Sequence, residues 1–144
     1  MTIKQLSIFL ENKAGTLLRV LETLKTANIQ LIASTLADTM DFGIYRIICS
    51  EPTRAYEVLK EAGVAVTYSD VFAIELDNHP GQAADAMEVF AREDVAISYL
   101  YSFLLGGKGI MVFRTDQANR AREIIILEKL KFITEDQLLT LANE

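Results

Sequence analysis

Residues 10–17 read Leu-Glu-Asn-Lys-Ala-Gly-Thr-Leu, and residues 76–83 read Leu-Asp-Asn-His-Pro-Gly-Gln-Ala. Each stretch follows alternating apolar residues, places Asn three positions before Gly, and precedes apolar residues at helical spacing. The same offset of 66 positions relates Gly43-Ile44 to Gly109-Ile110 and Arg54-Ala55-x-Glu57 to Arg120-Ala121-x-Glu123. A single ungapped register across these matches indicates an internal duplication.

Outward from the two turns, the hydrophobic pattern predicts one order of elements in both copies, β-α-β-β-α-β. In copy one we expect strands at 5–10, 29–35, 43–49 and 64–68, with helices at about 16–27 and 52–62. In copy two we expect strands at 72–76, 95–103, 109–115 and 130–133, with helices from Pro80 and around 121–125. The fold class is therefore α+β: two tandem ferredoxin-like βαββαβ units, each an antiparallel sheet with its helices on one face.

The end of the chain has an element that copy one lacks. Thr134-Glu135-Asp136-Gln137 has the capping-box pattern, which predicts a short C-terminal helix through about Ala142. The expected domains are 1–69, 70–133 and a helical tail at 134–144. In copy one the sheet face away from the helices is expected to remain apolar and to require a partner surface. We place on that face Phe9, Ile32, Leu36, Ile44 and Ile48.

Composition excludes several classes of function. The chain is 51% apolar and 24% charged, which is typical of a globular protein. A net charge of −6 argues against nucleic acid as a partner, because phosphate binding requires clustered Lys and Arg. The longest apolar runs are too short for a membrane helix, and the N-terminal residues do not resemble a secretory signal. The single Cys49 cannot form an internal disulfide, so a cytoplasmic location is expected.

Three features of the sequence could indicate catalysis or metal binding, but a structural interpretation fits each of them better. Gly106-Gly107-Lys108-Gly109 lacks the hydroxyl that follows Lys in a P-loop and reads as a hairpin turn. The only histidine, His79, has no partner ligand nearby and reads as an exposed turn residue. Cys49 should point into the core. We therefore predict no catalytic residues, no metal and no cofactor, and hence not an enzyme.

The repeated Arg-Ala-x-Glu cluster lies on the second helix of each copy. Arg54 and Glu57, like Arg120 and Glu123, stand three residues apart, which predicts an exposed ion pair on each helix. A docking patch for a partner protein is the alternative.

The turn before the first helix of each copy is the best candidate binding site. Its glycine permits close approach to the backbone, and the N–H groups at a helix N-terminus favour a carboxylate or phosphate. Asn12 and Asn78 add polar side chains at the same place. A plain capping turn, in which Asn and Gly are also common, is equally compatible with these residues.

At this turn the sequence resembles the ACT domain, a regulatory module that binds small molecules. The resemblance rests on residues 10–17 followed by Asn28-Ile29-Gln30-Leu31, and on residues 76–81 followed by Asp94-Val95-Ala96-Ile97. It covers nearly the whole chain as two tandem domains. The Glu-Asn-x-x-Gly form is similar to the serine-sensing regulatory domain of phosphoglycerate dehydrogenase. That form has His where this chain has Leu10 and Leu76, which argues against serine as the ligand.

The resemblance implies a ligand held between paired domains by the turn and by polar residues that enter the second strand. Carried over residue by residue, the expected ligand-binding positions are Asn12, Lys13, Ala14, Gly15 and Gln30 in copy one, and Asn78, His79, Pro80, Gly81 and Ala96 in copy two. The phosphoglycerate dehydrogenase form has Asn where Gln30 and Ala96 stand, so the two sites should be unequal.

The function implied is a non-catalytic allosteric sensor, expected as a homodimer, that binds an amino acid or similar ligand and regulates a separate metabolic enzyme or regulator. The alternative is a protein-interaction subunit that docks on a catalytic partner, as the acetolactate synthase small subunit does. An RNA-binding plait is a third possibility, which the acidic composition opposes.

Overall fold

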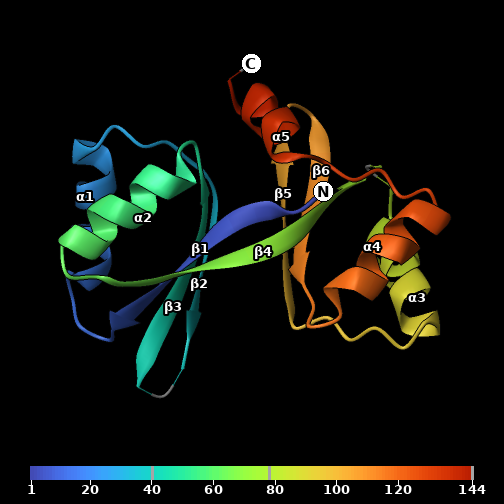
Figure 1. Ribbon diagram of the computed structural model, residues 1–144, viewed down its shortest axis with the longest axis horizontal. Helices are drawn as coiled ribbons and strands as arrows, with labels where there is room; N and C mark the ends of the chain where they lie inside the picture. The colour runs from blue at the N-terminus through green and yellow to red at the C-terminus, as the bar shows by residue number, and fades with distance from the viewer. Residues whose placement is uncertain (40, 78, 144) are drawn as a thin grey trace. The chain divides into compact units, whose positions relative to one another are not determined.

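The computed structural model describes residues 1–39, 41–77 and 79–143 (Figure 1). In chain order the elements are β1 (Ile3–Glu11), α1 (Thr16–Thr26), β2 (Leu31–Asp38), β3 (Phe42–Cys49), α2 (Pro52–Glu61), β4 (Ala65–Leu76), α3 (Gln82–Arg92), β5 (Tyr99–Leu105), β6 (Lys108–Arg114), α4 (Ala118–Leu127) and α5 (Glu135–Ala142). The predicted fold class, two tandem ferredoxin-like units followed by a C-terminal helix, is confirmed.

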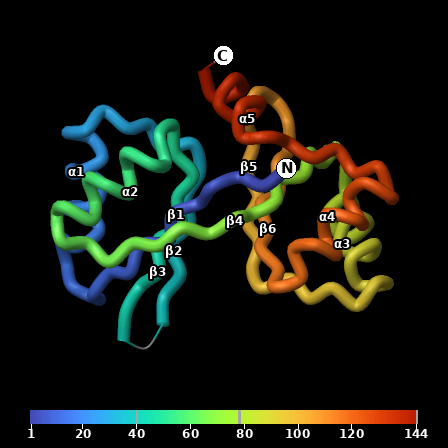
Figure 2. Tube along the Cα trace, in the orientation of Figure 1, coloured from blue at the N-terminus to red at the C-terminus, as the bar shows by residue number. Residues whose placement is uncertain are grey.

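The chain forms two compact units. Lys4–Ser69 make the N-terminal unit, and Met1–Ile3 together with Asp70–Glu144 make the C-terminal unit. Figure 2 traces the chain through both. Strands follow the order β2-β3-β1-β4 in the N-terminal unit and β4-β6-β5 in the C-terminal unit, so β4 contributes to both.

Each unit has a hydrophobic core between its sheet and its helices. In the N-terminal unit, Val20 and Leu24 of α1 are buried with Ile47 of β3. The C-terminal unit buries Phe90 of α3 and Phe113 of β6. The α1 pair lies at helical spacing, as an amphipathic helix requires. Cys49 is buried within the N-terminal core, as predicted.

The first four helices end in the same way. The N–H of Ile29 bonds to the carbonyl of Leu24, and the N–H of Val95 bonds to that of Phe90, at 3.0 and 2.9 Å. Val64 N–H to Leu59 O and Leu130 N–H to Ile125 O repeat this bond at 3.0 Å each. A hydrogen bond from an N–H to the carbonyl five residues earlier is typical of the Schellman motif. In this motif the residue just before the N–H donor takes a positive φ. Those residues are Asn28, Gly63, Asp94 and Lys129, with φ of 58°, 79°, 57° and 53°. The duplication therefore extends to the backbone.

Several predicted strand boundaries are wrong. The strands expected at 64–68 and 72–76 form one strand, β4, because neither Gly nor Pro interrupts Ser69-Asp70-Val71. The strand expected at 130–133 is reduced to one bridge between Phe132 and Ile74. Lys129 ends the preceding helix with positive φ and Thr134 caps α5, which leaves little chain for pairing. β2 and β5 also begin later than predicted, at Leu31 and Tyr99.

The prediction for the apolar sheet face is wrong at Leu36. Leu36 pairs with Tyr45, whose side chain lies in the helix-facing core, and paired residues share a face. A register shift between Leu31 and Ala33 makes Ile32 the extra residue of a bulge, which reverses the alternation that sequence alone suggests. Phe9 and Ile44 pair with each other on the opposite face, as predicted.

The repeated arginines tie helices together. Arg120 pairs with Glu123 at 2.9 Å, as predicted, and also with Glu93, just after α3. Arg54 pairs with Glu51 rather than Glu57, at 2.9 Å, and donates to the carbonyl of Ala27, just after α1. Because Ala27 and Glu93 are equivalent positions, both arginines join the second helix of a copy to the end of the first.

Candidate functional site

The described residues of the turns before α1 and α3 share their backbone geometry. Gly15 and Gly81 precede these helices with φ of 91° and 89°. Lys13 N–H bonds to Glu11 O at 2.8 Å, and His79 N–H bonds to Asp77 O at 2.9 Å, at equivalent positions. Across the described residues of these turns, no side chain caps either helix. Both helix N-termini therefore combine an exposed glycine with N–H groups that lack a side-chain cap.

The side chain of Asn12 connects the first turn to the end of the β2–β3 hairpin through hydrogen bonds. Its Nδ2 donates to Asp38 Oδ1 at 3.1 Å and, less closely, to Thr39 O at 3.4 Å. Thr16 Oγ1 also donates to Glu11 O at 2.8 Å, which holds the start of α1 against the strand. The amide of Asn12 therefore has a structural role that sequence alone did not predict.

An open pocket of about 490 Å³ lies beside this turn. Its lining includes Asn12, Lys13 and Ala14 from the turn, with Leu36 and Gly43 from the neighbouring hairpin. Three expected ligand-binding residues thus lie in one concavity of a size that suits a small molecule.

Charge at the mouth of this pocket is balanced by a local ion pair. Lys13 Nζ lies 2.9 Å from Glu11 Oε2. The hydrogen bond and positive charge of Lys13 hold the pKa of the Glu11 carboxyl below its ordinary value. Both side chains are exposed, so a carboxylate ligand can compete with Glu11 for Lys13.

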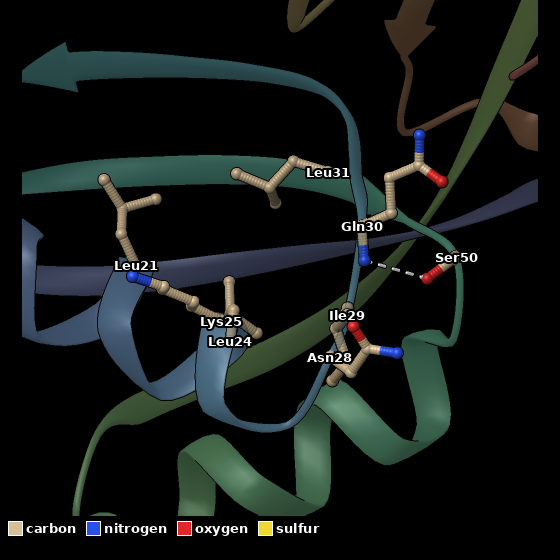
Figure 3. A pocket seen from close by; sticks show the side chains of 8 residues that line it. All are labelled: Leu21, Leu24, Lys25, Asn28, Ile29, Gln30, Leu31 and Ser50. Carbon is tan, nitrogen blue, oxygen red and sulfur yellow. Dashed lines mark hydrogen bonds between the residues drawn. The ribbon is translucent and has the colours of Figure 1, made fainter.

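Gln30 lies in a different pocket, of about 510 Å³, shown in Figure 3. Its backbone N–H donates to Ser50 Oγ at 3.0 Å, and its side-chain amide points away from Leu21 and Leu24. Gln30 follows the C-terminus of α1, whereas Gly15 precedes its N-terminus. The 11 residues of α1 span about 16 Å, so one small molecule cannot contact both ends within one unit.

The residue of copy two that is equivalent to Gln30 is Ala96. Ala96 is exposed, and its carbonyl accepts a hydrogen bond from Thr115 Oγ1 at 2.7 Å. Its methyl side chain offers nothing polar. His79, Pro80 and Gly81 are exposed in the second turn, and Asn78 lies outside the described residues.

Substituting Gly15 tests the turn itself. Gly15→Ala should lower the free energy of unfolding by about 1–2 kcal/mol, because a Cβ is unfavourable at φ 91°. Gly15→Asn should cost less, since Asn tolerates this region better. Chemical denaturation followed by circular dichroism measures both. Gly43→Ala is the matched control, because its φ is not positive and its Cβ would lie 3.4 Å from the flexible end of Leu36. An equal loss in Gly15→Ala and Gly43→Ala would contradict the role of backbone strain.

Two other kinds of site find no support in the part of the chain that the structure describes. Among residues 1–39, 41–77 and 79–143, no group of three His, Cys, Asp or Glu side chains is placed to hold a metal ion. Within the same residues, no helix combines the length and apolar character needed to cross a membrane.

A family model described as an ACT domain pair matches residues 1–142. The chain therefore belongs to the ACT domain family, and it contains two ACT domains.

Several solved structures share this fold. Protein BT0572 from Bacteroides thetaiotaomicron is 39% identical, with 98% of each chain covered and a TM-score of 0.91. The ligand-free regulatory subunit of aspartate kinase from Thermus thermophilus is 12% identical over 86% of this chain and 91% of that one, with a TM-score of 0.60. The regulatory subunit from Thermus flavus is 12% identical over 98% and 92% of the two chains, with a TM-score of 0.58. Among curated proteins no match is found.

Proposed function

We propose that this chain is an allosteric sensor that binds an amino acid or a similar small ligand at interfaces between ACT units. The observation that carries the proposal is the pair of equivalent turns before α1 and α3, with Gly15 and Gly81 at nearly the same φ. Helix N-termini of this kind favour a carboxylate. Asn12, Lys13, Ala14 and Gly15 serve the first site, and Asn78, His79, Pro80 and Gly81 the second.

Pairing of units is part of this proposal. Gln30 and Ala96 lie beyond the helix end opposite to each turn, so they complete a site only from another unit. We therefore propose a homodimer in the cytoplasm, with 1–69 and 70–133 as its ligand-binding domains and 134–144 as a tail. Light scattering should give twice the 16.1 kDa of one chain.

The regulated enzyme is proposed to be a separate polypeptide. Chains of this fold include the regulatory subunit of aspartate kinase from Thermus thermophilus, which supports such a division of labour. The same reasoning makes a metabolic enzyme the proposed partner of this chain.

Introducing a negative charge into the turns tests the binding site. Titration calorimetry with each of the twenty amino acids should identify at least one that binds. Ala14→Asp with Pro80→Asp should weaken that binding tenfold or more, because both positions are exposed beside the proposed carboxylate site. An acidic residue at a helix N-terminus stabilises the helix, so a loss of binding would not reflect unfolding.

The matched control is Ala118→Asp, which puts the same charge in the first turn of α4, where the glycine turn is missing. Its binding should equal that of the unsubstituted chain. Binding that persists in the double variant, or no binding of any amino acid, would contradict the proposal. A stable complex with an enzyme in the absence of amino acids would instead favour a pure interaction subunit.

A further inference from the structure

A pocket in the C-terminal unit lies between the β5–β6 hairpin and α5, and its described lining residues do not include any from the turns before α1 and α3. Figure 1 shows α5 beside this hairpin. The pocket has a volume of about 350 Å³, within the range of about 300–1,000 Å³ common for small-molecule sites. Its walls come from one unit and include Glu75, Lys108, Ile133, Asp136, Thr140 and Leu141.

The glycine-rich segment that sequence analysis singled out builds one wall. Gly106 and Gly107 have φ of 59° and 76°, and Leu105 pairs with Lys108 across them, which makes a two-residue hairpin turn. Lys108 therefore begins β6. Glu75 pairs with Ile110 on the adjacent strand, so Lys108 is its diagonal neighbour on the same face. Lys108 Nζ lies 3.6 Å from Glu75 Oε1.

Copy one shows that the fold does not require charges at these positions. The equivalents of Glu75 and Lys108 are Phe9 and Phe42, whose rings contact edge to face with centroids 5.9 Å apart. Copy two thus has an ion pair in place of an aromatic pair. This difference between the copies occurs where α5, which copy one lacks, forms a second wall of the pocket. That wall carries another carboxylate, Asp136.

The charged groups of the pocket can form further hydrogen bonds and ion pairs with a ligand. The Glu75–Lys108 distance of 3.6 Å exceeds the roughly 2.7–2.9 Å of a close charge-assisted hydrogen bond. An ammonium has three donors and a carboxylate has about four acceptor positions, so this one contact saturates neither group. Two carboxylates and one ammonium complement a ligand that carries both charges. Ile133 and Leu141 supply an apolar wall.

We propose that this pocket binds a zwitterion of amino-acid size. The ligand's ammonium group lies between Glu75 and Asp136, and its carboxylate lies at Lys108. Its side chain lies against Ile133 and Leu141. Such a ligand bridges α5 and the hairpin, at a site separate from the turns before α1 and α3.

Amide chemical shifts of the full ¹⁵N-labelled chain test the proposal. The probes are the twenty amino acids, with 1,4-diaminobutane and acetate as ligands that carry charge of one sign. At least one amino acid should shift the amide signals of Lys108, Thr140 and Leu141 in a saturable way, and the single-sign probes should bind at least tenfold more weakly. Lys108→Met and Glu75→Gln should each weaken the amino acid tenfold or more.

Lys13→Met is the matched control, because it removes an exposed lysine from the first turn while leaving this pocket intact. Shifts confined to residues 12–16 and 79–82 would overturn this proposal while supporting the turn sites. Shifts at Lys108, Thr140 and Leu141 without any shift in the turns would support this proposal and contradict the turn sites. Equal binding of 1,4-diaminobutane, or unchanged affinity in Glu75→Gln and Lys108→Met, would also overturn it. The spectrum of each variant reports whether it remains folded.

Discussion

Replacing Phe113 with alanine should lower the free energy of unfolding by about 3–5 kcal/mol. The Phe113 side chain is fully buried in the core of the C-terminal unit. Its ring stacks on Phe72 with centroids 5.4 Å apart and meets Phe90 edge to face at 5.0 Å. Truncation removes the shared member of both contacts and leaves a cavity that two rigid rings cannot fill.

Two variants separate the cavity from a general effect of substitution. Phe113→Leu keeps most of the side-chain volume and should cost clearly less than Phe113→Ala. Ile47→Ala changes the equivalent position of the N-terminal core and should cost about 2–5 kcal/mol. The chain has no tryptophan, so urea denaturation should be followed by far-ultraviolet circular dichroism. A loss under about 1 kcal/mol in Phe113→Ala would show that the aromatic cluster repacks.

Most of the fold could be predicted from local sequence, because the residues that form turns and helix caps are chemically specific. Gly15 and Gly81 occur where the backbone requires positive φ, and Gly106-Gly107 forms the predicted hairpin turn. Thr134 and Gln137 form the predicted capping box, with bonds of 3.2 and 2.9 Å between side chains and backbone. Such short-range signals need no knowledge of the partner strand.

The features that sequence did not reveal depend on strand register. The bulge at Ile32 moved Leu36 to the helix-facing side, and only the pairing of β2 with β3 discloses it. The proximity of Glu75 and Lys108, which are diagonal neighbours, likewise follows from the β4–β6 register, because these residues lie far apart in the chain. For the candidate site, sequence located both turns but could not show that Asn12 is engaged by Asp38.

Replacing Leu138 with alanine should lower the free energy of unfolding by about 2–3 kcal/mol and release α5. An isolated helix as short as α5, which has 8 residues, is unstable in water, so packing must hold it in place. Leu138 is its buried side chain, with 1% of its surface exposed. Leu→Ala substitutions in cores cost about 2–5 kcal/mol, and release of α5 limits the loss to the free energy of its docking.

Leu139→Ala is the matched control, because the adjacent side chain is only partly buried and should cost less. Amide hydrogen exchange distinguishes release from global unfolding: residues 138–142 should lose protection in Leu138→Ala while the amides of β6 keep theirs. Because α5 forms one wall of the pocket beside Lys108, its release should abolish binding there and leave the turn sites intact. Unchanged exchange in α5 would mean that contacts other than Leu138 hold the helix, and the pocket would then retain both walls.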